Sequence, residues 1–337
     1  MVPLAQAARV PVAADPVTAD EATADKAAVT APKGELAPGA TASRLADYAE
    51  LFKLRVTANI VLTAWAGFYL GSLRTGISSM QPGLIAVLLG IGLVAAGSAA
   101  MNEAIERKLD FKMLRTARRP MAAGRIGMIH GLTVSLGTMV LGTIFLMHAA
   151  NLLTGLLTLG TAFTYIAIYT PLKRYTTLAT FIGAFPGAMP PLLGWVAARG
   201  SIEWAAVALF ALLFVWQFPH FMAIAWLYRE DYARAGIRML PVVQPDGWST
   251  VVEAISYAVL MVPVSLLPVY LHLAGYWYGG VALALGLVYL GYTIRFSRIT
   301  RARSTVESKM YARDLLKVSV IYLPLLLLTL MLNATGK

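Results

Sequence analysis

The chain has 337 residues, of which 58% are hydrophobic and 13% charged, and its mean hydropathy is +0.67. This composition excludes an ordinary soluble domain and indicates a polytopic α-helical membrane protein. The formal net charge of +11 does not predict nucleic-acid binding, because most basic residues stand in short loops between apolar segments. The absence of cysteine excludes disulfides and thiolate metal sites.

Residues 1–45 are rich in Ala, Pro, Thr and Val and show no sustained hydrophobic period. They are predicted to form a disordered tail ahead of a membrane domain over residues 46–337. The start lacks a basic region followed by an apolar one, so a signal peptide is not expected. Its scattered Asp and Glu residues also disfavour a mitochondrial transit peptide.

Nine apolar segments follow, each near the roughly 20 residues that a helix needs to cross a bilayer. They are predicted at 54–73, 83–104, 127–148, 151–170, 178–198, 203–225, 252–274, 276–294 and 315–333. Several contain proline, which membrane helices tolerate where neighbouring groups satisfy the freed carbonyls. The expected fold is all-α, with nine transmembrane helices bundled around a central cavity open to the cytoplasmic face.

The basic residues are distributed unequally between alternate sides of these segments. One set of flanks and loops holds 21 Lys and Arg residues, from Lys53 to Lys317, whereas the other holds Arg74, Arg199 and Lys337. Because cytoplasmic loops carry an excess of Lys and Arg, the amino terminus and the charged loops are predicted to be cytoplasmic. With nine spans the carboxyl terminus lies on the opposite side, and the expected location is the bacterial inner membrane.

The stretch from Asn102 to Pro120 is densely charged after an apolar segment. Asn102, Glu106 and Asp110 recur every fourth residue, so a helix places their oxygens along one face. Arginines follow at once, and guanidinium groups bind phosphate well. The pattern suits a diphosphate ester bound through Mg²⁺, although a solvated helix end followed by a basic anchoring loop is the simpler alternative.

A second stretch, from Trp226 to Val242, repeats this order of acids, bases and a proline. It follows the sixth predicted span and therefore falls on the same side of the membrane. Glu230 and Asp231 at this helix end, facing the first acidic stretch, could hold a second Mg²⁺ about one diphosphate. The alternative is a loop whose acids pair with neighbouring arginines.

Asn102-x₃-Glu106-x₃-Asp110 resembles the first aspartate-rich motif, NxxxDxxxD, of the UbiA-type intramembrane prenyltransferases. Within that superfamily the sequence is most similar to the protohaem IX farnesyltransferases, also called haem O synthases. Further matches, in family order, are Lys112-Met113-x-Arg115-Thr116, Arg119-Pro120, Tyr169-Thr170, Lys173-Arg174, Gly187-Ala188-x-Pro190-Pro191, Gly194-Trp195, Trp216-Gln217-x-Pro219-His220-Phe221 and Glu230-Asp231-Tyr232-x₂-Ala235-Gly236-x₂-Met239-Leu240-Pro241. The tail before residue 45 and the last two spans add little to the resemblance.

Two positions depart from the superfamily pattern. Glu106 replaces the central Asp, with a longer arm and the same charge. Tyr228 and Tyr232 stand where the second motif usually reads DxxxD, with Asp231 between them. This second departure is similar to the haem O synthase branch and unlike a 4-hydroxybenzoate prenyltransferase.

The resemblance implies a set of site residues. Asn102, Glu106, Asp110 and Asp231 are the expected catalytic and Mg²⁺-binding residues. Arg115, Arg119, Lys173 and Arg174 are expected to bind the diphosphate, and His220, Tyr232 and Arg238 the haem. The candidate π-faces for a farnesyl cation are Trp65, Tyr69, Tyr165, Tyr169, Trp216 and Phe221. A His220 that only bonds a carbonyl between helices is the alternative to a haem contact.

The implied reaction transfers the farnesyl group of farnesyl diphosphate to a vinyl group of protohaem IX with addition of water, giving haem O. Mg²⁺ is the expected cofactor and haem b is a substrate. Haem A synthase and terminal oxidase assembly proteins are possible partners.

Prenylation of a quinone precursor or chlorophyllide is the alternative enzyme activity. A secondary transporter is the alternative class, but transporters place ionisable residues near the bilayer midplane, whereas charge here gathers at one membrane face.

Overall fold

The computed structural model describes residues 44–73, 82–302 and 304–335, and these belong to one compact unit, Ser43–Lys337. The predicted disordered tail lies outside the described residues except for its end. Arg44 and Leu45, which close the predicted tail, are the first residues of helix α2.

Every regular element in the described ranges is a helix. In chain order they are α2 (Arg44–Leu51), α3 (Leu54–Leu73), α4 (Pro82–Asp110), α5 (Met128–Ala149), α6 (Leu152–Phe163), the π-helix η2 (Thr164–Tyr169), α7 (Thr170–Leu172), α8 (Ala179–Arg199), α9 (Trp204–Leu227), α10 (Arg229–Ala235), α11 (Leu240–Val243), α12 (Trp248–Tyr270), α13 (Tyr276–Phe296), the 3₁₀-helix η3 (Ser297–Arg301) and α14 (Thr305–Leu332).

Nine helical segments of the described chain are long and apolar enough to cross a membrane, which confirms the predicted all-α, multi-pass membrane fold. The predicted spans and the observed helices differ mainly at polar ends. The second span continues from the predicted residue 104 to Asp110, and the ninth begins at Thr305 rather than at residue 315. Hydropathy marks only the apolar part of a helix, whereas backbone hydrogen bonding continues into the charged turns beyond it.

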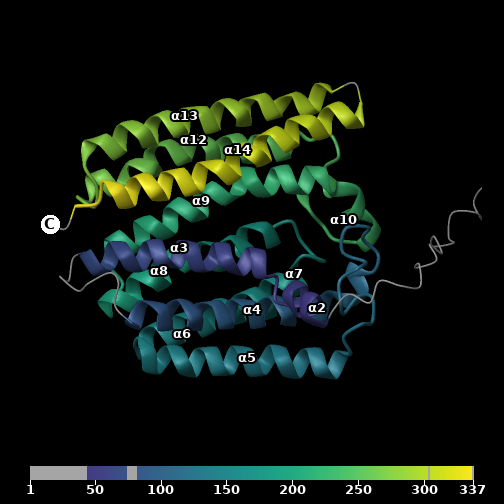
Figure 1. Cartoon of the computed structure of the whole chain (residues 1–337). Coiled ribbons are helices and arrows are strands. Elements are labelled where there is room, and N and C mark those ends of the chain that lie inside the picture. Colours follow the sequence, from purple (N-terminus) through teal and green to yellow (C-terminus); the bar gives the residue numbers. More distant parts are fainter. Residues whose placement is uncertain (1–43, 74–81, 303, 336–337) are drawn as a thin grey trace, which may run out of the picture. The chain divides into compact units, whose positions relative to one another are not determined.

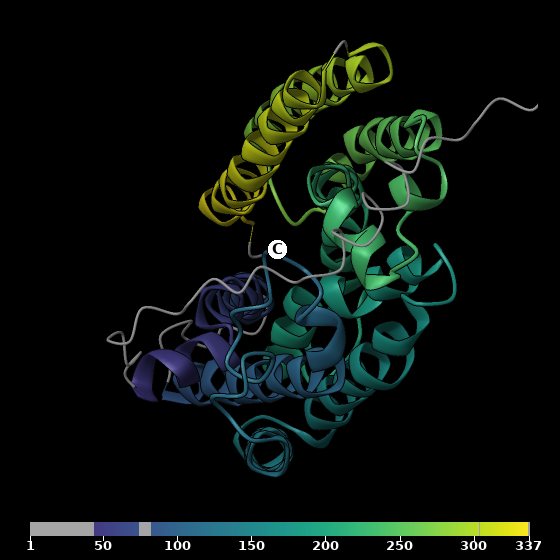
Figure 2. The same ribbon diagram turned by 90° about the vertical axis from the view of Figure 1, so that its right-hand side faces the viewer.

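The spans lie side by side with alternating direction, so successive connections fall at opposite ends of the bundle (Figure 1). One end carries α2, α7 and α10. Figure 2 faces this end and shows α12, α13 and α14 to one side and α4 and α5 to the other. The predicted basic loops therefore come together at a single end.

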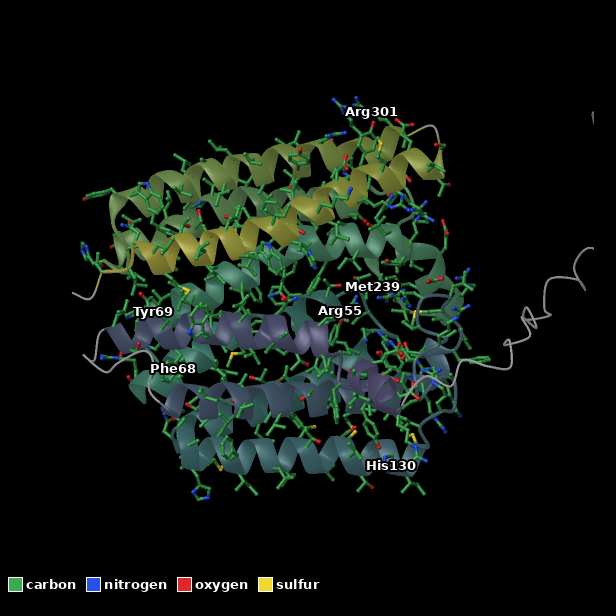
Figure 3. All side chains as sticks on the ribbon, in the orientation of Figure 1. Arg55, Phe68, Tyr69, His130, Met239 and Arg301 are labelled. Carbon is green, nitrogen blue, oxygen red and sulfur yellow. The ribbon has the colours of Figure 1, made fainter. Side chains whose placement is uncertain are left out.

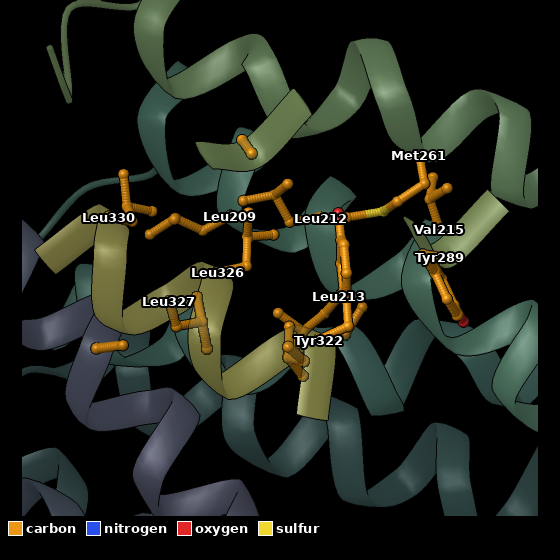
Figure 4. Close-up of a cluster of buried hydrophobic side chains, with 14 of the residues drawn as sticks. Leu209, Leu212, Leu213, Val215, Met261, Tyr289, Tyr322, Leu326, Leu327 and Leu330 are labelled. Carbon is orange, nitrogen blue, oxygen red and sulfur yellow. The ribbon is translucent and has the colours of Figure 1, made fainter. Parts of the chain in front are cut away.

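Two kinds of packing hold the spans together. A large apolar core lies between α9, α12, α13 and α14, where Leu209, Leu212, Met261 and Leu326 are fully buried (Figure 4). In contrast, α3 and α8 meet backbone to backbone: a Cβ on Gly194 would lie 1.9 Å from the carbonyl oxygen of Ala64. Small residues at such contacts let membrane helices approach closely.

Candidate active site

A cavity of about 470 Å³ is lined by residues of α3, α4, η2, α8 and α9 together with the loops at the α10 end. Its size lies within the roughly 300–1,000 Å³ of small-molecule sites. Met239, one of the lining residues, lies towards the end that carries Arg301, whereas Phe68 and Tyr69 lie towards the other end (Figure 3). Another hollow, of about 630 Å³, is lined by Ile202 and Trp204 with Glu203 as its charged group, and that acid already pairs with Arg199.

One wall of the cavity is the acidic face of α4. Asn102, Glu106 and Asp110 are all buried and all line the cavity, because a four-residue spacing keeps them on one helix face. The Asn102 amide donates hydrogen bonds to Glu106 Oε2 at 2.9 Å and to Thr170 Oγ1 at 3.0 Å. The amide oxygen of Asn102 is thereby turned away from Glu106.

Three bases from other segments meet this face. Lys173 Nζ lies 2.6 Å from Glu106 Oε1, and Arg119 Nη1 donates to both carboxylate oxygens of Asp110 at 2.9 and 3.0 Å. Lys53 Nζ donates to Asn102 Oδ1 at 3.2 Å. The cavity therefore joins two buried carboxylates to three cations, a net excess of positive charge that suits an anionic ligand.

The pKa values of the two lysines differ because their partners differ. Burial opposes the charged form of Lys173, but the neighbouring Tyr169 and Glu106 raise its pKa above the usual value. Burial, helped by the positive charges of Arg119 and Lys173, lowers the pKa of Lys53 to about 8. An anion entering the cavity would favour the charged form of Lys53.

Lys53 is a cavity residue that the sequence motifs do not include. It lies between α2 and α3 with a positive φ of 46°, a conformation that is uncommon for a residue other than glycine. In the sequence, Lys53 is only one of the basic residues that predict the membrane topology. Nothing in its local pattern relates it to Asn102, 49 residues later.

The second charged stretch contacts the first. The Arg115 side chain donates to Tyr232 Oη at 3.4 Å, its backbone N–H donates to Asp231 Oδ2 at 3.4 Å, and its guanidinium lies 4.7 Å from the ring centre of Tyr228. Asp231 also forms an ion pair with Arg234 and does not line the cavity. In this structure Asp231 ties α10 to the loop after α4, away from the α4 carboxylates.

The structure brings most of the predicted site residues to the cavity, but not all of them. Those that line it are Asn102, Glu106, Asp110, Arg115, Arg119, Lys173, His220 and Tyr232; those that do not are Asp231, Arg174 and Arg238. Arg174 and Arg238 are exposed. The Arg238 backbone N–H donates to the carbonyl oxygen of Lys173 at 2.9 Å, so the two charged loops are joined there.

Aromatic side chains form a second wall. Tyr165 and Tyr169, on the π-helix η2, stack with ring centres 5.7 Å apart, and the Thr170 hydroxyl donates to the carbonyl oxygen of Tyr165 at 2.8 Å. Trp216 and Phe221 of α9 also line the cavity, whereas Trp65 and Tyr69, two other predicted π-faces, do not. Deeper in the cavity the lining is aliphatic, with residues such as Ile60, Ile91, Val94 and Leu193.

His220, on α9, also lines the cavity. Its ring stacks on Trp216, with centres 5.0 Å apart, and its Nδ1 lies 2.8 Å from Ser319 Oγ. As in the predicted alternative, His220 makes a hydrogen bond to another helix, but its partner is a hydroxyl group and not a carbonyl.

The α4 face fits a divalent cation that is shared with a phosphate ligand. Within the described residues no three His, Asp or Glu side chains gather at one point, so α4 offers two carboxylates and one amide oxygen. Mg²⁺ is commonly held by one or two carboxylates together with substrate phosphates and water. The donor set therefore suits Mg²⁺ bound jointly with a diphosphate, rather than a metal held by protein alone.

Comparison with known proteins gives one family. Residues 60–315 match the model of the UbiA prenyltransferase family. A curated relative from Koribacter versatilis, named protoheme IX farnesyltransferase, is 51% identical over 91% of this chain and 99% of its own length. A relative from Solibacter usitatus with the same name is 40% identical over 86% of this chain and 99% of its own length.

Solved structures agree in fold. A digeranylgeranylglyceryl phosphate synthase structure superposes with a TM-score of 0.69 at 18% identity, over 86% of this chain and 98% of its own. A UbiA homologue from Archaeoglobus fulgidus, bound to GPP and Mg²⁺, superposes with a TM-score of 0.58 at 16% identity, over 84% of this chain and 99% of its own. At these identities the likeness concerns the fold alone.

Proposed function

The chain belongs to the UbiA prenyltransferase family, and we propose that it transfers the farnesyl group of farnesyl diphosphate to a vinyl group of protohaem IX, with addition of water, to give haem O. The observation that carries the proposal is a single cavity that joins the acidic face of α4 and three bases to an aromatic and aliphatic interior containing His220. Relatives that share most of the chain's length carry the corresponding name.

The polar end of the cavity binds and activates the diphosphate. Asn102, Glu106 and Asp110 would hold Mg²⁺, which when bound neutralises the charge that develops on the leaving group. Lys173 and Arg119 exchange their present carboxylate partners for phosphate oxygens, with Lys53 beside them. The allylic C–O bond then breaks, and its electron pair leaves with the diphosphate.

The interior of the cavity holds the prenyl chain and the cation. The aliphatic lining accommodates a C15 chain and excludes water, and the stacked rings of Tyr165 and Tyr169 offer π-faces near the breaking bond. A cation over an aromatic face gains about 0.5–2 kcal/mol, more where water is excluded. Tyr169 also lies beside Lys173, whose Nζ is 4.8 Å from the ring centre, which supports a role for this ring where the leaving group and the cation separate.

The acceptor enters from the side of α9. The π electrons of a vinyl group form the new C–C bond, the positive charge moves to the carbon next to the porphyrin ring, and water adds there with loss of a proton. His220 is our candidate for the haem contact. The exposed Arg238 is our candidate for the propionates, because guanidinium groups bind carboxylates in a bidentate manner. Arg115, which lines the cavity, remains a candidate for the diphosphate.

We place the α10 end of the bundle in the cytoplasm of a bacterium and the chain in its inner membrane. The excess of Lys and Arg in the connections at that end supports this orientation. Farnesyl diphosphate, which is charged, would then reach the polar end of the cavity from water while its chain enters the apolar part.

The test is an assay of membranes that contain the chain, supplied with haem b, farnesyl diphosphate and Mg²⁺. Mass analysis of extracted haems should find a product with one farnesyl group and one hydroxyl, and in H₂¹⁸O the hydroxyl should carry the label. Membranes with 4-hydroxybenzoate in place of haem are the specificity control. Prenylated benzoate together with unmodified haem would leave the family assignment standing and remove the proposed acceptor.

A further inference from the structure

Ser319, on α14, contacts two side chains that line the cavity from α9, although it does not line the cavity itself. The Trp216 indole N–H donates to the Ser319 carbonyl oxygen at 2.9 Å, and His220 Nδ1 lies 2.8 Å from Ser319 Oγ. Ser319 is fully buried. One residue of the last span thus holds both rings of the stacked Trp216–His220 pair.

The hydrogen on each atom of this contact can be assigned from the distances. Ser319 Oγ lies 2.7 Å from the carbonyl oxygen of Leu316, and two oxygens so close require a hydrogen between them. The serine hydroxyl has only one hydrogen, so it is used towards Leu316. Ser319 Oγ therefore accepts from His220, whose Nδ1 must carry the hydrogen.

This arrangement fixes which nitrogen of His220 is available to a ligand. In a neutral imidazole with hydrogen on Nδ1, the lone pair is on Nε2. The Nδ1 edge is turned towards α14, which leaves the Nε2 edge for the cavity that His220 lines. Histidines that bind iron or zinc are usually oriented in this way by a hydrogen bond from the other nitrogen.

Residues of α13 and α14 also contact the part of α9 that carries Trp216 and His220. Tyr289 Oη of α13 donates to the carbonyl oxygen of Trp216 at 2.9 Å, and the Tyr289 ring stacks on Tyr322 of α14, with centres 4.8 Å apart. Both tyrosines belong to the apolar core of Figure 4. Since Pro219 has no N–H, α9 also lacks one of its own hydrogen bonds here, and the contacts with α13 and α14 support this part of the helix.

We infer that Ser319 is a positioning residue for the acceptor substrate: it holds His220 in one orientation and one tautomer, with the Nε2 lone pair directed to the haem. The inference rests on the proposed function, because the acceptor is protohaem there. It also gives the last span, which the family motifs do not reach, a place in the reaction.

Ser265 offers a matched control in the same chain. It is fully buried in a membrane span, α12, and its hydroxyl donates to the carbonyl three residues earlier, at 2.8 Å. Its own carbonyl accepts from an aromatic donor, Tyr278 Oη, at 2.9 Å. Ser265→Ala thus removes the same kind of buried hydroxyl without touching His220.

The experiment compares Ser319→Ala, Ser319→Thr and Ser265→Ala in purified full-length protein. Ser319→Ala should weaken haem binding by about 10- to 100-fold, shift the Soret band and raise the KM for haem, while the KM for farnesyl diphosphate stays unchanged. Ser319→Thr, which keeps a hydroxyl, and Ser265→Ala should behave like the wild type. Unchanged haem affinity, Soret band and KM in Ser319→Ala would overturn the inference.

A second measurement needs no substitution at Ser319. This measurement is an NMR spectrum of the protein labelled with ¹⁵N-histidine. The resonances that disappear in the spectrum of His220→Ala identify His220, and they should show that its Nδ1 is the protonated nitrogen. A hydrogen on Nε2 would overturn the inference even if Ser319→Ala fails to fold. If the wild type makes farnesylated haem but shows these contrary results, only the inference fails. If the wild type neither binds nor converts haem, the proposed function fails with it.

Discussion

Each carboxylate on the cavity face of α4 is paired with a base from a distant segment. Asp110 is almost fully buried and takes two hydrogen bonds from Arg119, and Glu106 meets Lys173. Burying a charge without a partner costs several kcal/mol, so the pairs keep the site stable while no ligand is bound. They also place the bases within reach of any phosphate that approaches the same carboxylates through a metal ion.

Asp110→Ala should abolish turnover while the protein still inserts and folds. The change removes a proposed metal ligand and leaves Arg119 without its partner, so we expect kcat to fall by at least about 100-fold, as for other groups that stabilise developing charge. The measurement is haem O formation at saturating substrates.

The matched control for Asp110→Ala is Asp314→Ala. Asp314 also pairs with an arginine, Arg295, at 3.2 Å, but it does not line the cavity. Activity should stay near the wild-type level. Equal losses in the two variants would mean that the effect of Asp110 comes from lost stability and not from the site.

Removal of divalent cations should stop the reaction, and Mg²⁺ or Mn²⁺ should restore it. The reason is that the α4 side chains offer hard oxygen donors and the proposed substrate is a diphosphate. Full activity in EDTA would exclude the metal-bridged mode of binding.

Glu106→Asp should stay active, since it keeps the charge that meets Lys173.

At the scale of the elements, the contact between α3 and α8 depends on glycine. Gly194 faces the carbonyl oxygen of Ala64, and Gly67 faces that of Pro191, each at 1.9 Å from where a Cβ would lie. A backbone cannot move aside as a flexible side chain can, so α3 and α8 would have to separate. Since α3 and α8 both line the cavity, their spacing also sets its width.

Gly194→Ala should lower the apparent melting temperature of the protein in detergent, because overpacking costs about 1–3 kcal/mol or more. Gly160→Ala, in α6, is the control: no atom lies within 4 Å of its added Cβ, and alanine favours a helix over glycine. A melting temperature for Gly194→Ala equal to that of Gly160→Ala would contradict the close helix contact.

At the scale of the whole molecule, the connections that carry most of the basic residues lie at the α10 end of the bundle (Figure 1). This follows from the alternating direction of the spans, because antiparallel helices bring every second connection to the same side. Lys53, Arg119, Lys173 and Tyr232 all come from such connections or from the helices directly beside them. A site assembled in this way requires the spans between these connections to alternate in direction.

Reporters fused after Lys108 and after Lys337 should report opposite compartments, with Lys108 on the cytoplasmic side. The 21-to-3 distribution of Lys and Arg between the two sides is the reason for this expectation. A reporter in the connection 271–275, between α12 and α13, adds an internal check, since it should report the same compartment as Lys337. The same compartment for Lys108 and Lys337 would contradict an odd number of spans.

The sequence alone determined those features that depend on local pattern. The length of an apolar segment predicts a membrane helix because a bilayer requires about 20 residues, whatever the neighbouring helices are. The nine predicted spans agree with the helices of the structure, and they differ mainly at the polar ends. The face shared by Asn102, Glu106 and Asp110 was equally predictable, since it follows from helical periodicity within one segment.

Only the tertiary structure decided which distant groups meet. It placed Lys53 beside Asn102, tied Asp231 to Arg115 outside the cavity lining, and set Ser319 behind His220 across 99 residues. Charge and motif spacing along the chain say which residues can bind phosphate or metal, but not how far a loop is from the cavity. That distance is set by packing between helices, which is why Arg174 and Arg238, both expected at the site, are exposed beyond its lining.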